Sequence, residues 1–372
     1  MGACSYQRES KNKVIIEEKD STQLENPIEE KKEPIIHEAS LFMVGDDLIH
    51  VAIYVGAQLL GNGQYDFHPM LKRMANIAKG YDLAYYNQET IIGGDERGAS
   101  TFPLFNTPTA FGDAMVDAGF NIVSTATNHS LDATSLGARH AKAYWKEKGI
   151  VEDGINLSFE EQEEIHVHEV NGISYAFFSY TYGMNGLQPP SDEEYLINCY
   201  TGQEERVYER IRKAKEMCDV VIIAMHWGIE YMTTPTDEQI QLAQNLANAG
   251  ADIIIGNHPH MIQPFEWLNE GKSIVFYALG NFISAQKDDS LIGIMAALNI
   301  RKIEDEEGVR IELCDAKVDL HYTYFRENQL RSTEIIPFSE LDESHLVNHK
   351  RIYERMIQII TSRDDRIQIG GF

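Results

Sequence analysis

Five apolar runs in this sequence end in side chains that bind metal ions or transfer protons. These side chains are Asp46 and Asp47 after "FMVG", Asn87 and Glu89 in "DLAYYNQE", Asn128 and His129 in "IVSTATNH", His226 in "VVIIAMHWG", and His258 and His260 in "IIIGNHPH". Carboxylates, imidazoles and an amide oxygen together form a mixed donor set, which suits Mn²⁺, Fe or Zn²⁺ better than Ca²⁺. Such a set could hold one ion, or two ions about 3.5–4 Å apart that polarise an oxyanion and generate hydroxide.

Each of these residues also has an ordinary structural interpretation. A histidine after a strand often bonds a backbone carbonyl, Asp46 could cap a helix, and Asn128 could occupy a turn. The joint pattern favours the metal interpretation, because the carboxyl ends of neighbouring parallel strands meet at one edge of a sheet.

The elements that must position these residues alternate along the chain from about residue 39. Strands are predicted at 40–45, 121–127, 173–181, 219–225, 251–256 and 273–280, and helices at 105–120, 135–149, 204–217, 236–250 and 343–360. The segments 292–303 and 309–320 alternate like antiparallel strands. This order favours an α/β fold built around buried central strands.

Local chemistry predicts several details of these elements. Thr107 is the expected N-cap of the first of these helices, with Pro108 at its first position, and Gly149 and Gly250 are expected to end two later helices. Pro259 restricts the residue before it to an extended conformation, which would point His258 and the next histidine to the same side.

The charge balance excludes one class of partner. The chain has 372 residues, with 32 Lys and Arg against 58 Asp and Glu, a formal net charge of −26. Neutralising nucleic-acid phosphates needs a basic surface, so we expect no nucleic-acid partner. An anionic substrate would require a local reversal of this field, such as a metal ion supplies.

Other catalytic and membrane patterns fail. The sequence contains neither a G-x-S-x-G nucleophile elbow nor a G-x-x-x-x-G-K-[ST] phosphate loop. No apolar run approaches the roughly 20 residues of a membrane-spanning helix. The four cysteines include no C-x-x-C pair, which leaves a thiolate zinc site unsupported.

The amino-terminal segment has the composition of a tether. "GACS" at residues 2–5 is similar to the cleavage end of a bacterial lipoprotein signal, with Cys4 as the lipidated residue; the alternative is an ordinary start followed by a disordered tail. Charged residues of both signs dominate 5–37, which is typical of a disordered or extended linker. We therefore predict a tether at 1–38, a main domain at 39–330 and a helical extension at 331–372.

Six motifs, in order, resemble the CapA family of poly-γ-glutamate capsule synthesis proteins. They are "VGDDLIH", "DLAYYNQET", "AGFNIVSTATNHSLD", "AMHWGIEY", "AGADIIIGNHPHMIQPFE" and "IVFYALGNFIS", and they span roughly residues 39–330. This family resembles a branch of the calcineurin-like metallophosphatase superfamily. The resemblance implies a four-layered α/β/β/α sandwich.

The resemblance also implies roles for individual residues. Asp46, Asn128, His226, His258 and His260 match metal ligands, Glu89 matches a bridging carboxylate, and His129 matches a histidine that serves as general acid or orients an oxyanion. Two departures stand out: Leu48 occupies the histidine position of the phosphatase Asp-x-His motif, and Asn87-Gln88-Glu89 replaces Gly-Asp. One of two metal positions is then a ligand short.

Five further residues are candidates for contact with a substrate: Arg97, Tyr182, Glu230, Tyr231 and Asn281. Arg97 lies in a polar loop and has the alternative of simple solvation.

The sequence supports three functional hypotheses. The first is an extracytoplasmic metal-dependent hydrolase or transferase that acts on poly-γ-glutamate or a related cell-surface polymer, attached to the membrane only through a lipid anchor. The second is a non-catalytic assembly or export factor that works with membrane subunits of a polymer synthase. The third is a phosphodiesterase or nucleotidase, which the missing Asp-x-His motif disfavours.

Overall fold

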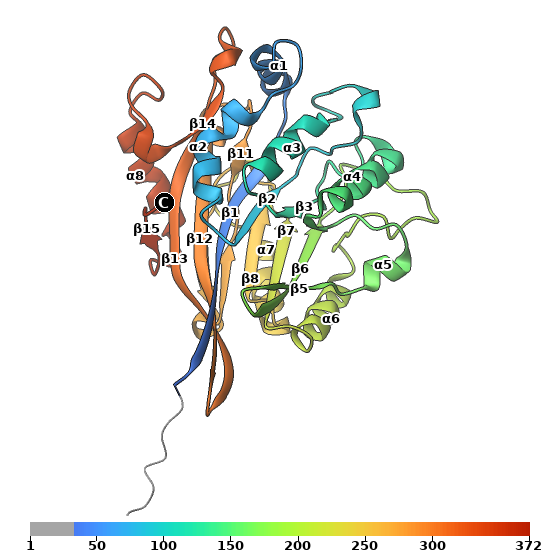
Figure 1. Cartoon of the computed structure of the whole chain (residues 1–372), viewed down its shortest axis with the longest axis vertical. Coiled ribbons are helices and arrows are strands. Elements are labelled where there is room, and N and C mark those ends of the chain that lie inside the picture. Colours follow the sequence, from blue (N-terminus) through green and yellow to red (C-terminus); the bar gives the residue numbers. More distant parts are fainter. Residues whose placement is uncertain (1–32) are drawn as a thin grey trace, which may run out of the picture. The chain divides into compact units, whose positions relative to one another are not determined.

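Two mixed β-sheets lie face to face, with helices on both outer faces (Figure 1). The computed structural model of the chain describes residues 33–372. Cys4 and nearly all of the predicted tether therefore lie outside the described residues.

The first sheet has the strand order β14-β13-β12-β1-β2-β3-β4, with β11 beside β1 and β15 beside β13. Its strands are β1 (Ile35–Asp47), β2 (Leu83–Asn87), β3 (Ile122–Ser124), β4 (Val151–Asp153), β11 (Asn281–Ile283), β12 (Ile292–Asp305), β13 (Gly308–Tyr324), β14 (Glu334–Pro337) and β15 (Gln368–Ile369). Strands β1 to β4 run parallel, whereas β12, β13 and β14 pair antiparallel, as the alternation in their sequences predicts.

The second sheet has the order β5-β6-β7-β8-β10-β9. Its strands are β5 (Val167–Val170), β6 (Ile173–Thr181), β7 (Val220–His226), β8 (Ile253–Asn257), β9 (Phe265–Leu268) and β10 (Ser273–Phe276). The four central strands are parallel and the two edge strands are antiparallel. Strands β7 and β8 are buried along their whole length, which explains their continuous apolar runs.

Eight α-helices are described, with short 3₁₀ turns between elements. They are α1 (Val51–Leu60), α2 (His68–Ala78), α3 (Thr109–Asp117), α4 (Thr134–Lys148), α5 (Phe159–Glu163), α6 (Glu204–Lys215), α7 (Asp237–Ala249) and α8 (His349–Ile360). Within residues 33–372, no helix has both the length and the apolar character needed to cross a membrane.

Three apolar cores separate four layers. The first joins the facing sides of the two sheets, where Leu41 and Tyr85 share a cluster with Ile222 and Ile255. Helices α1 to α4 cover the outer face of the first sheet, and α6 and α7 cover the outer face of the second. This arrangement confirms the predicted α/β/β/α sandwich.

Helix ends largely follow their sequence signals. Thr236 and Gln239 form a capping box at α7, and Gly149 and Gly250 close α4 and α7 in left-handed conformations. The prediction at α3 was wrong by one residue, because the helix begins at Thr109 with Pro108 as its cap. The hydroxyl of Thr107 instead donates to the carbonyl of Thr90, 2.8 Å away.

The carboxyl-terminal segment 331–372 contains α8 and also two short strands. Both β14 and β15 pair with β13, so this segment extends the first sheet. Met356 and Ile360 of α8 enter the core between the two sheets.

Glycine at position 45 allows β1 to pack closely against the backbone of Gly280, which precedes β11. A Cβ on Gly45 would lie 1.8 Å from the carbonyl oxygen of Gly280, so only glycine permits this approach. As a result Asp46, at the end of β1, lies in register with Asn87 of β2 on one side and Asn281 of β11 on the other.

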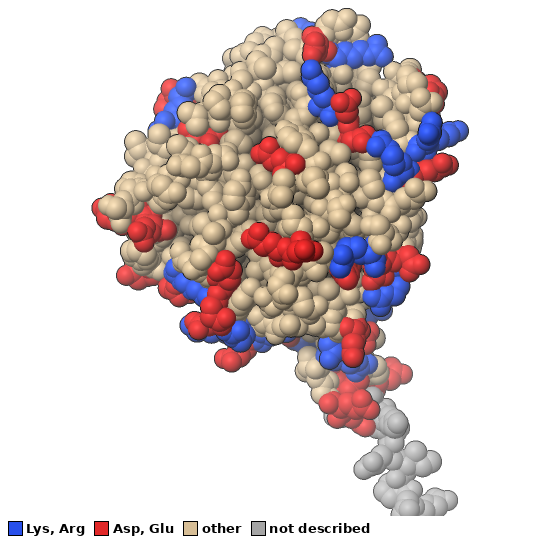
Figure 2. Space-filling view, turned by 180° about the vertical axis from the view of Figure 1, so that it is seen from behind, with Lys and Arg blue, Asp and Glu red and all other residues tan. Residues whose placement is uncertain are grey.

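Acidic and basic side chains are interspersed on the face shown in Figure 2. Ion pairs among the described residues include Lys302 with Asp219 at 3.2 Å. That face offers no continuous basic track, as the net charge of the chain predicts.

Candidate metal centre

Six side chains predicted as metal ligands lie together at the carboxyl ends of the parallel strands. They are Asp46 after β1, Glu89 after β2, Asn128 after β3, His226 at the end of β7, and His258 and His260 after β8. None is more than 3% exposed. The two sheets therefore bring together residues that are up to 214 positions apart in the sequence, counted from Asp46 to His260.

Five of these side chains form two groups that share one carboxylate, and the sixth, Asn128, contacts His226. In one, ligand atoms of Glu89, His226 and His258 all lie within 4.8 Å of one another; in the other, those of Asp46, Glu89 and His260 do. Each group has the donor number and chemistry of a site that keeps a position open for water or substrate. Glu89 belongs to both groups, as expected of the bridging carboxylate that the resemblance implies.

Glu89 is the strongest indication that a cation belongs here. Its carboxylate is completely buried, and within residues 33–372 neither oxygen has a hydrogen-bond partner. Burial, with Asp46 and Asp47 nearby, raises the pKa of the Glu89 carboxyl well above its usual value. Buried carboxylates are normally paired or coordinate metals, so the surrounding residues fit a divalent ion.

The imidazoles have the protonation state that metal binding requires. Burial, reinforced by neighbouring imidazoles, lowers the pKa of His226 well below its usual value and that of His258 to about 3. Both rings are therefore neutral near pH 7 and keep a lone pair for an ion. The Nδ1 atom of His258 has no partner among the described residues, and the Nε2 atom of His226 lies 3.0 Å from the Asn128 amide oxygen.

The turn that carries His258 and His260 does not have the predicted backbone. Both residues have positive φ, 96° and 59°, so the expectation of an extended His258 was wrong. The backbone N–H of His258 donates to the Asp46 carboxylate at 3.0 Å, which holds this unusual conformation in place. The two rings converge through a tight left-handed turn rather than through strand alternation, and such strain is typical of functional sites.

Two residues without an assigned role support the carboxylates. Asp47 accepts hydrogen bonds from the backbone N–H of Glu89 and the side chain of Gln88. The amide of Asn87 donates to Asp46 at 2.8 Å and accepts from the Ser124 hydroxyl. These contacts fix the orientation of the ligands, a role often filled by the residues behind a metal site.

His129 lies beside the cluster as half of a dyad. Its Nδ1 is 2.6 Å from the Asp132 carboxylate, which also accepts the backbone N–H of Phe105 at 2.7 Å. The Phe105 ring packs edge-on against the imidazole, 4.9 Å between centroids. The sequence prediction missed Asp132, although its position three residues after His129 in "NHSLD" was a usable signal.

The candidates for substrate contact separate into three classes. The Tyr182 ring lies tilted against the His258 ring with centroids 4.8 Å apart, and the Tyr231 ring lies 6.0 Å from that of His260. Glu230 is exposed and reaches the open side of the cluster. Arg97 is exposed in a 3₁₀ turn at Asp95–Arg97 and makes no contact with the cluster among those found in residues 33–372.

Asn281 lies beneath the cluster rather than at its mouth. It is completely buried, and its amide nitrogen donates to the Ser290 carbonyl at 2.7 Å. Its oxygen lies 3.0 Å from Nδ1 of His260, which places the proton on Nδ1 and leaves Nε2 free to face Glu89 at 3.6 Å. The prediction of a substrate contact therefore conflicts with its burial, and its contacts are those of a residue that orients His260.

Position 48, where the Asp-x-His motif has its histidine, is a buried leucine. Leu48 is 2% exposed and offers no ligand atom. His50 lies close to His260 and His129, and burial together with these imidazoles lowers its pKa to about 4. It belongs to none of the ligand groups found among the described residues.

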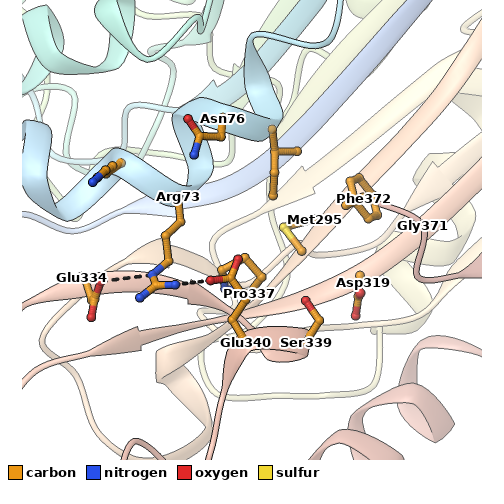
Figure 3. Close-up of a pocket in the computed structure, with 12 residues that line it drawn as sticks. Arg73, Asn76, Met295, Asp319, Glu334, Pro337, Ser339, Glu340, Gly371 and Phe372 are labelled. Atoms are coloured by element: carbon orange, nitrogen blue, oxygen red, sulfur yellow. Dashed lines mark hydrogen bonds and ion pairs between the residues drawn. The ribbon is translucent and has the colours of Figure 1, made fainter.

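A separate cavity of about 510 Å³ lies on the outer side of the first sheet, between α2, β13 and β14 (Figure 3). Arg73 there bonds Glu334 at 3.1 Å and also Glu340. None of the six candidate ligands lines this cavity.

The profile of the bacterial capsule synthesis protein PGA_cap family matches residues 40–286, about two thirds of the chain. The chain belongs to this family. The matched region contains every predicted site residue, and the resemblance drawn from the six motifs is confirmed.

Characterised relatives come from two bacilli. The chain is 28% identical over 259 residues to the capsule biosynthesis protein CapA of Bacillus anthracis, covering 65% of this chain and 62% of that protein. It is 33% identical over 183 residues to the PGA biosynthesis protein CapA of Bacillus subtilis, covering 46% and 44%. The chain thus matches less than two thirds of the length of either relative.

Solved structures with some likeness include phosphatases. A phosphatase from Mycoplasma pneumoniae has 15% identity and a TM-score of 0.44, with 76% of this chain and 95% of that chain covered. The calcineurin-like phosphoesterase YfkN from Bacillus subtilis has 13% identity and a TM-score of 0.42, with 87% and 98% covered.

Proposed function

We propose that this chain is a metal-dependent hydrolase or transferase that acts outside the cytoplasm on poly-γ-glutamate or a related cell-surface polymer. The observation that carries the proposal is the buried carboxylate of Glu89. It has no hydrogen-bond partner within residues 33–372 and is shared by two groups of imidazole and carboxylate side chains. Membership in a capsule synthesis family supplies the biological context.

The ligands would be Asp46, Glu89, Asn128, His226, His258 and His260, and their nitrogen and oxygen donors suit Mn²⁺, Fe or Zn²⁺. One or two bound divalent ions would supply Lewis-acid polarisation of a carbonyl or phosphoryl oxygen and would acidify water. The shared carboxylate supports two positions, whereas the gap at Leu48 leaves one of them short of a ligand.

His129 is the proposed proton donor, and Asp132 orients it. Because the Asp132 carboxylate holds the proton on Nδ1 of His129, the ring exchanges its other proton at Nε2. An Nε2 proton beside the cluster can be donated to the leaving group, the role of a general acid. Tyr182 and Tyr231 flank the same opening and are the proposed contacts for the polymer.

The electrostatics constrain how an anionic polymer would bind. A glutamate polymer carries carboxylates and the chain itself has a net charge of −26. Attraction must therefore be local, and the cations at this centre are the proposed source. The proposal includes lipidation of Cys4, which would attach the protein to the membrane on its extracytoplasmic side. Metabolic labelling of the native protein with a fatty acid tests this lipidation.

Genetic complementation tests the proposal against the alternative of a non-catalytic assembly or export factor. A deletion strain would receive the full chain or its Asp46→Ala or His226→Ala variant, with His166→Ala as a matched control on an exposed histidine. We expect capsule polymer with the wild type and the control but not with the cluster variants. Full rescue by folded cluster variants would instead support the assembly factor.

A direct assay complements this experiment. Purified chain incubated with poly-γ-glutamate and added Mn²⁺ should change the chain-length distribution of the polymer, and EDTA should prevent the change. A parallel panel of phosphoesters distinguishes a phosphodiesterase or nucleotidase, whose activity would appear in that panel instead.

A further inference from the structure

Glu230 lies on the open side of the cluster, in the loop that follows β7. Its carboxylate and ligand nitrogens of His258 and His260 all lie within 4.8 Å of one another. Glu230 is exposed, whereas both histidines are buried. It therefore approaches the two imidazoles from the solvent side, opposite the buried carboxylate of Glu89.

The loop is fastened to the turn that carries both imidazoles. The backbone N–H of Tyr231 donates to the Pro259 carbonyl at 2.7 Å, and the side chain of Gln263 donates to the Met232 carbonyl at 3.0 Å. Tyr231 has a positive φ of 65°, so the chain bends sharply directly after Glu230. These contacts hold the backbone of Glu230 at a fixed place above the histidines.

The two buried ligand groups lack negative charge for the ions they would hold. Asp46 and Glu89 are the only carboxylates in them, and the remaining members are imidazoles. Two divalent ions carry four positive charges, which two carboxylates only half neutralise in a buried site. The Asp46, Glu89 and His260 group is also the one left short by Leu48, since it contains Asp46 of the incomplete Asp-x-His motif.

We propose that Glu230 is a further ligand of this metal centre, contributed from the solvent side, and that it completes the group containing His260 in place of the ligand missing at position 48. The inference rests on the proposed function, because it requires that the cluster holds metal. In Asp-x-His enzymes the histidine of that motif is the ligand. Here Glu230, from a loop of the second sheet, would take its place.

The arrangement would enclose the centre between two carboxylates. Glu89 lies below and belongs to both buried groups, while Glu230 lies above and reaches one imidazole from each. His258 contributes an Nδ1 atom that is buried and has no partner among the described residues. A polymer oxygen entering the site would approach beside Glu230.

Metal titration of the full chain tests this assignment. Binding of Mn²⁺ would be measured by equilibrium dialysis for the wild type and for Glu230→Gln, which keeps the shape and removes the charge. Glu238→Gln is the matched control, since it removes an equal charge from the exposed first turn of α7. We expect Glu230→Gln to weaken Mn²⁺ binding by about tenfold or more, the least effect of losing a residue that supports a metal site.

Folding of the variant is checked separately by its metal-free thermal transition, which should match the wild type because Glu230 is exposed and makes no hydrogen bond among those found in residues 33–372. Equal Mn²⁺ affinity of Glu230→Gln and wild type would overturn this inference and leave the proposed function standing. Absence of Mn²⁺ binding by the wild type would overturn both. A metal-bound crystal structure with Glu230 directed into solvent would also overturn it.

Discussion

The cluster of candidate metal ligands and the cavity of Figure 3 both contain charged side chains, but within residues 33–372 these charges are paired in the cavity and not in the cluster. In the cavity, the guanidinium of Arg73 is bonded to Glu334 and Glu340. In the cluster, the carboxylate of Glu89 is fully buried and has no hydrogen-bond partner among the described residues. A roomy cavity with satisfied charges needs no ligand, whereas buried polar atoms without partners indicate one.

The largest expected effect comes from removing the shared carboxylate. Glu89→Gln should weaken divalent metal binding by about 100-fold or more, the upper range for loss of a residue that supports a metal site. Without metal, however, the variant should melt at a higher temperature than the wild type, because burial raises the pKa of Glu89 and its charge is unfavourable at pH 7. Thermal unfolding in EDTA measures the expected rise in melting temperature. Thermal unfolding in Mn²⁺ measures the expected loss of stabilisation by metal.

Glu334→Gln is the matched control from the cavity. It removes a carboxylate of the same type from a half-exposed ion pair and should leave Mn²⁺ binding unchanged. If Glu89→Gln and Glu334→Gln behave alike in both measurements, the contrast between the two regions is lost.

The dyad beside the cluster should separate catalysis from metal binding. Asp132→Asn replaces the acceptor of the Nδ1 proton of His129 and should lower the rate of polymer cleavage by about 10²-fold, at the lower end of general acid contributions. Mn²⁺ affinity should stay at the wild-type value, since Asp132 belongs to none of the ligand groups found in residues 33–372. A coincident loss of metal would show that the dyad is part of the metal site itself.

His321 tests whether an unpartnered buried group is sufficient for a site. It is completely buried, and neither ring nitrogen has a partner among the described residues, but no carboxylate joins it in a ligand group. Burial lowers its pKa to about 3, while the unfolded chain has its ordinary value near 6.5. Below pH 6.5 the His321 ring is therefore protonated in the unfolded chain but stays neutral in the folded chain. This difference lowers the free energy of unfolding as the pH falls from 6.5 towards the folded-state pKa.

Removing His321 should remove that pH dependence and nothing else. For His321→Leu, the free energy of unfolding should fall less steeply between pH 6 and 4 than for the wild type, by up to about 1.4 kcal/mol per pH unit. Mn²⁺ affinity should not change. Urea unfolding at several pH values measures the two slopes, and parallel curves would contradict the assignment.

The smallest effect is expected in the cavity. Arg73→Met breaks partly exposed ion pairs, which contribute about 1 kcal/mol or less to stability. Polymer cleavage and metal binding should equal those of the wild type. A loss of activity in this variant would place function in the cavity and reverse the comparison.

Much of the site could be predicted because its residues follow apolar runs whose ends must meet. The rule that parallel strands end at one edge groups Asp46 with Glu89 in the first sheet and His226 with the histidines after β8 in the second. That the two edges face each other follows from the packing of the two sheets and not from this rule. The alternation of strands and helices predicted an α/β fold, whereas the four layers were predicted only by the resemblance to the capsule synthesis family.

The backbone of the "GNHPH" turn was not predictable from local rules. Pro259 favours an extended residue before it, yet His258 takes a φ of 96° because the Asp46 carboxylate accepts its N–H. That partner is 212 residues away. The burial of Asn281 was missed for a different reason, since its side-chain amide is enclosed by the irregular segment that follows it and donates there to Ser284 and Ser290.

The most direct test of a metal centre is a crystal structure of the full chain with anomalous diffraction measured at the Mn, Fe and Zn absorption edges. We predict anomalous density beside Glu89, between its carboxylate and the imidazoles of His226, His258 and His260, with ligand distances near 2.0–2.2 Å for zinc. Clear side-chain density with no anomalous peak at this position, from protein supplied with all three metals, would contradict the account.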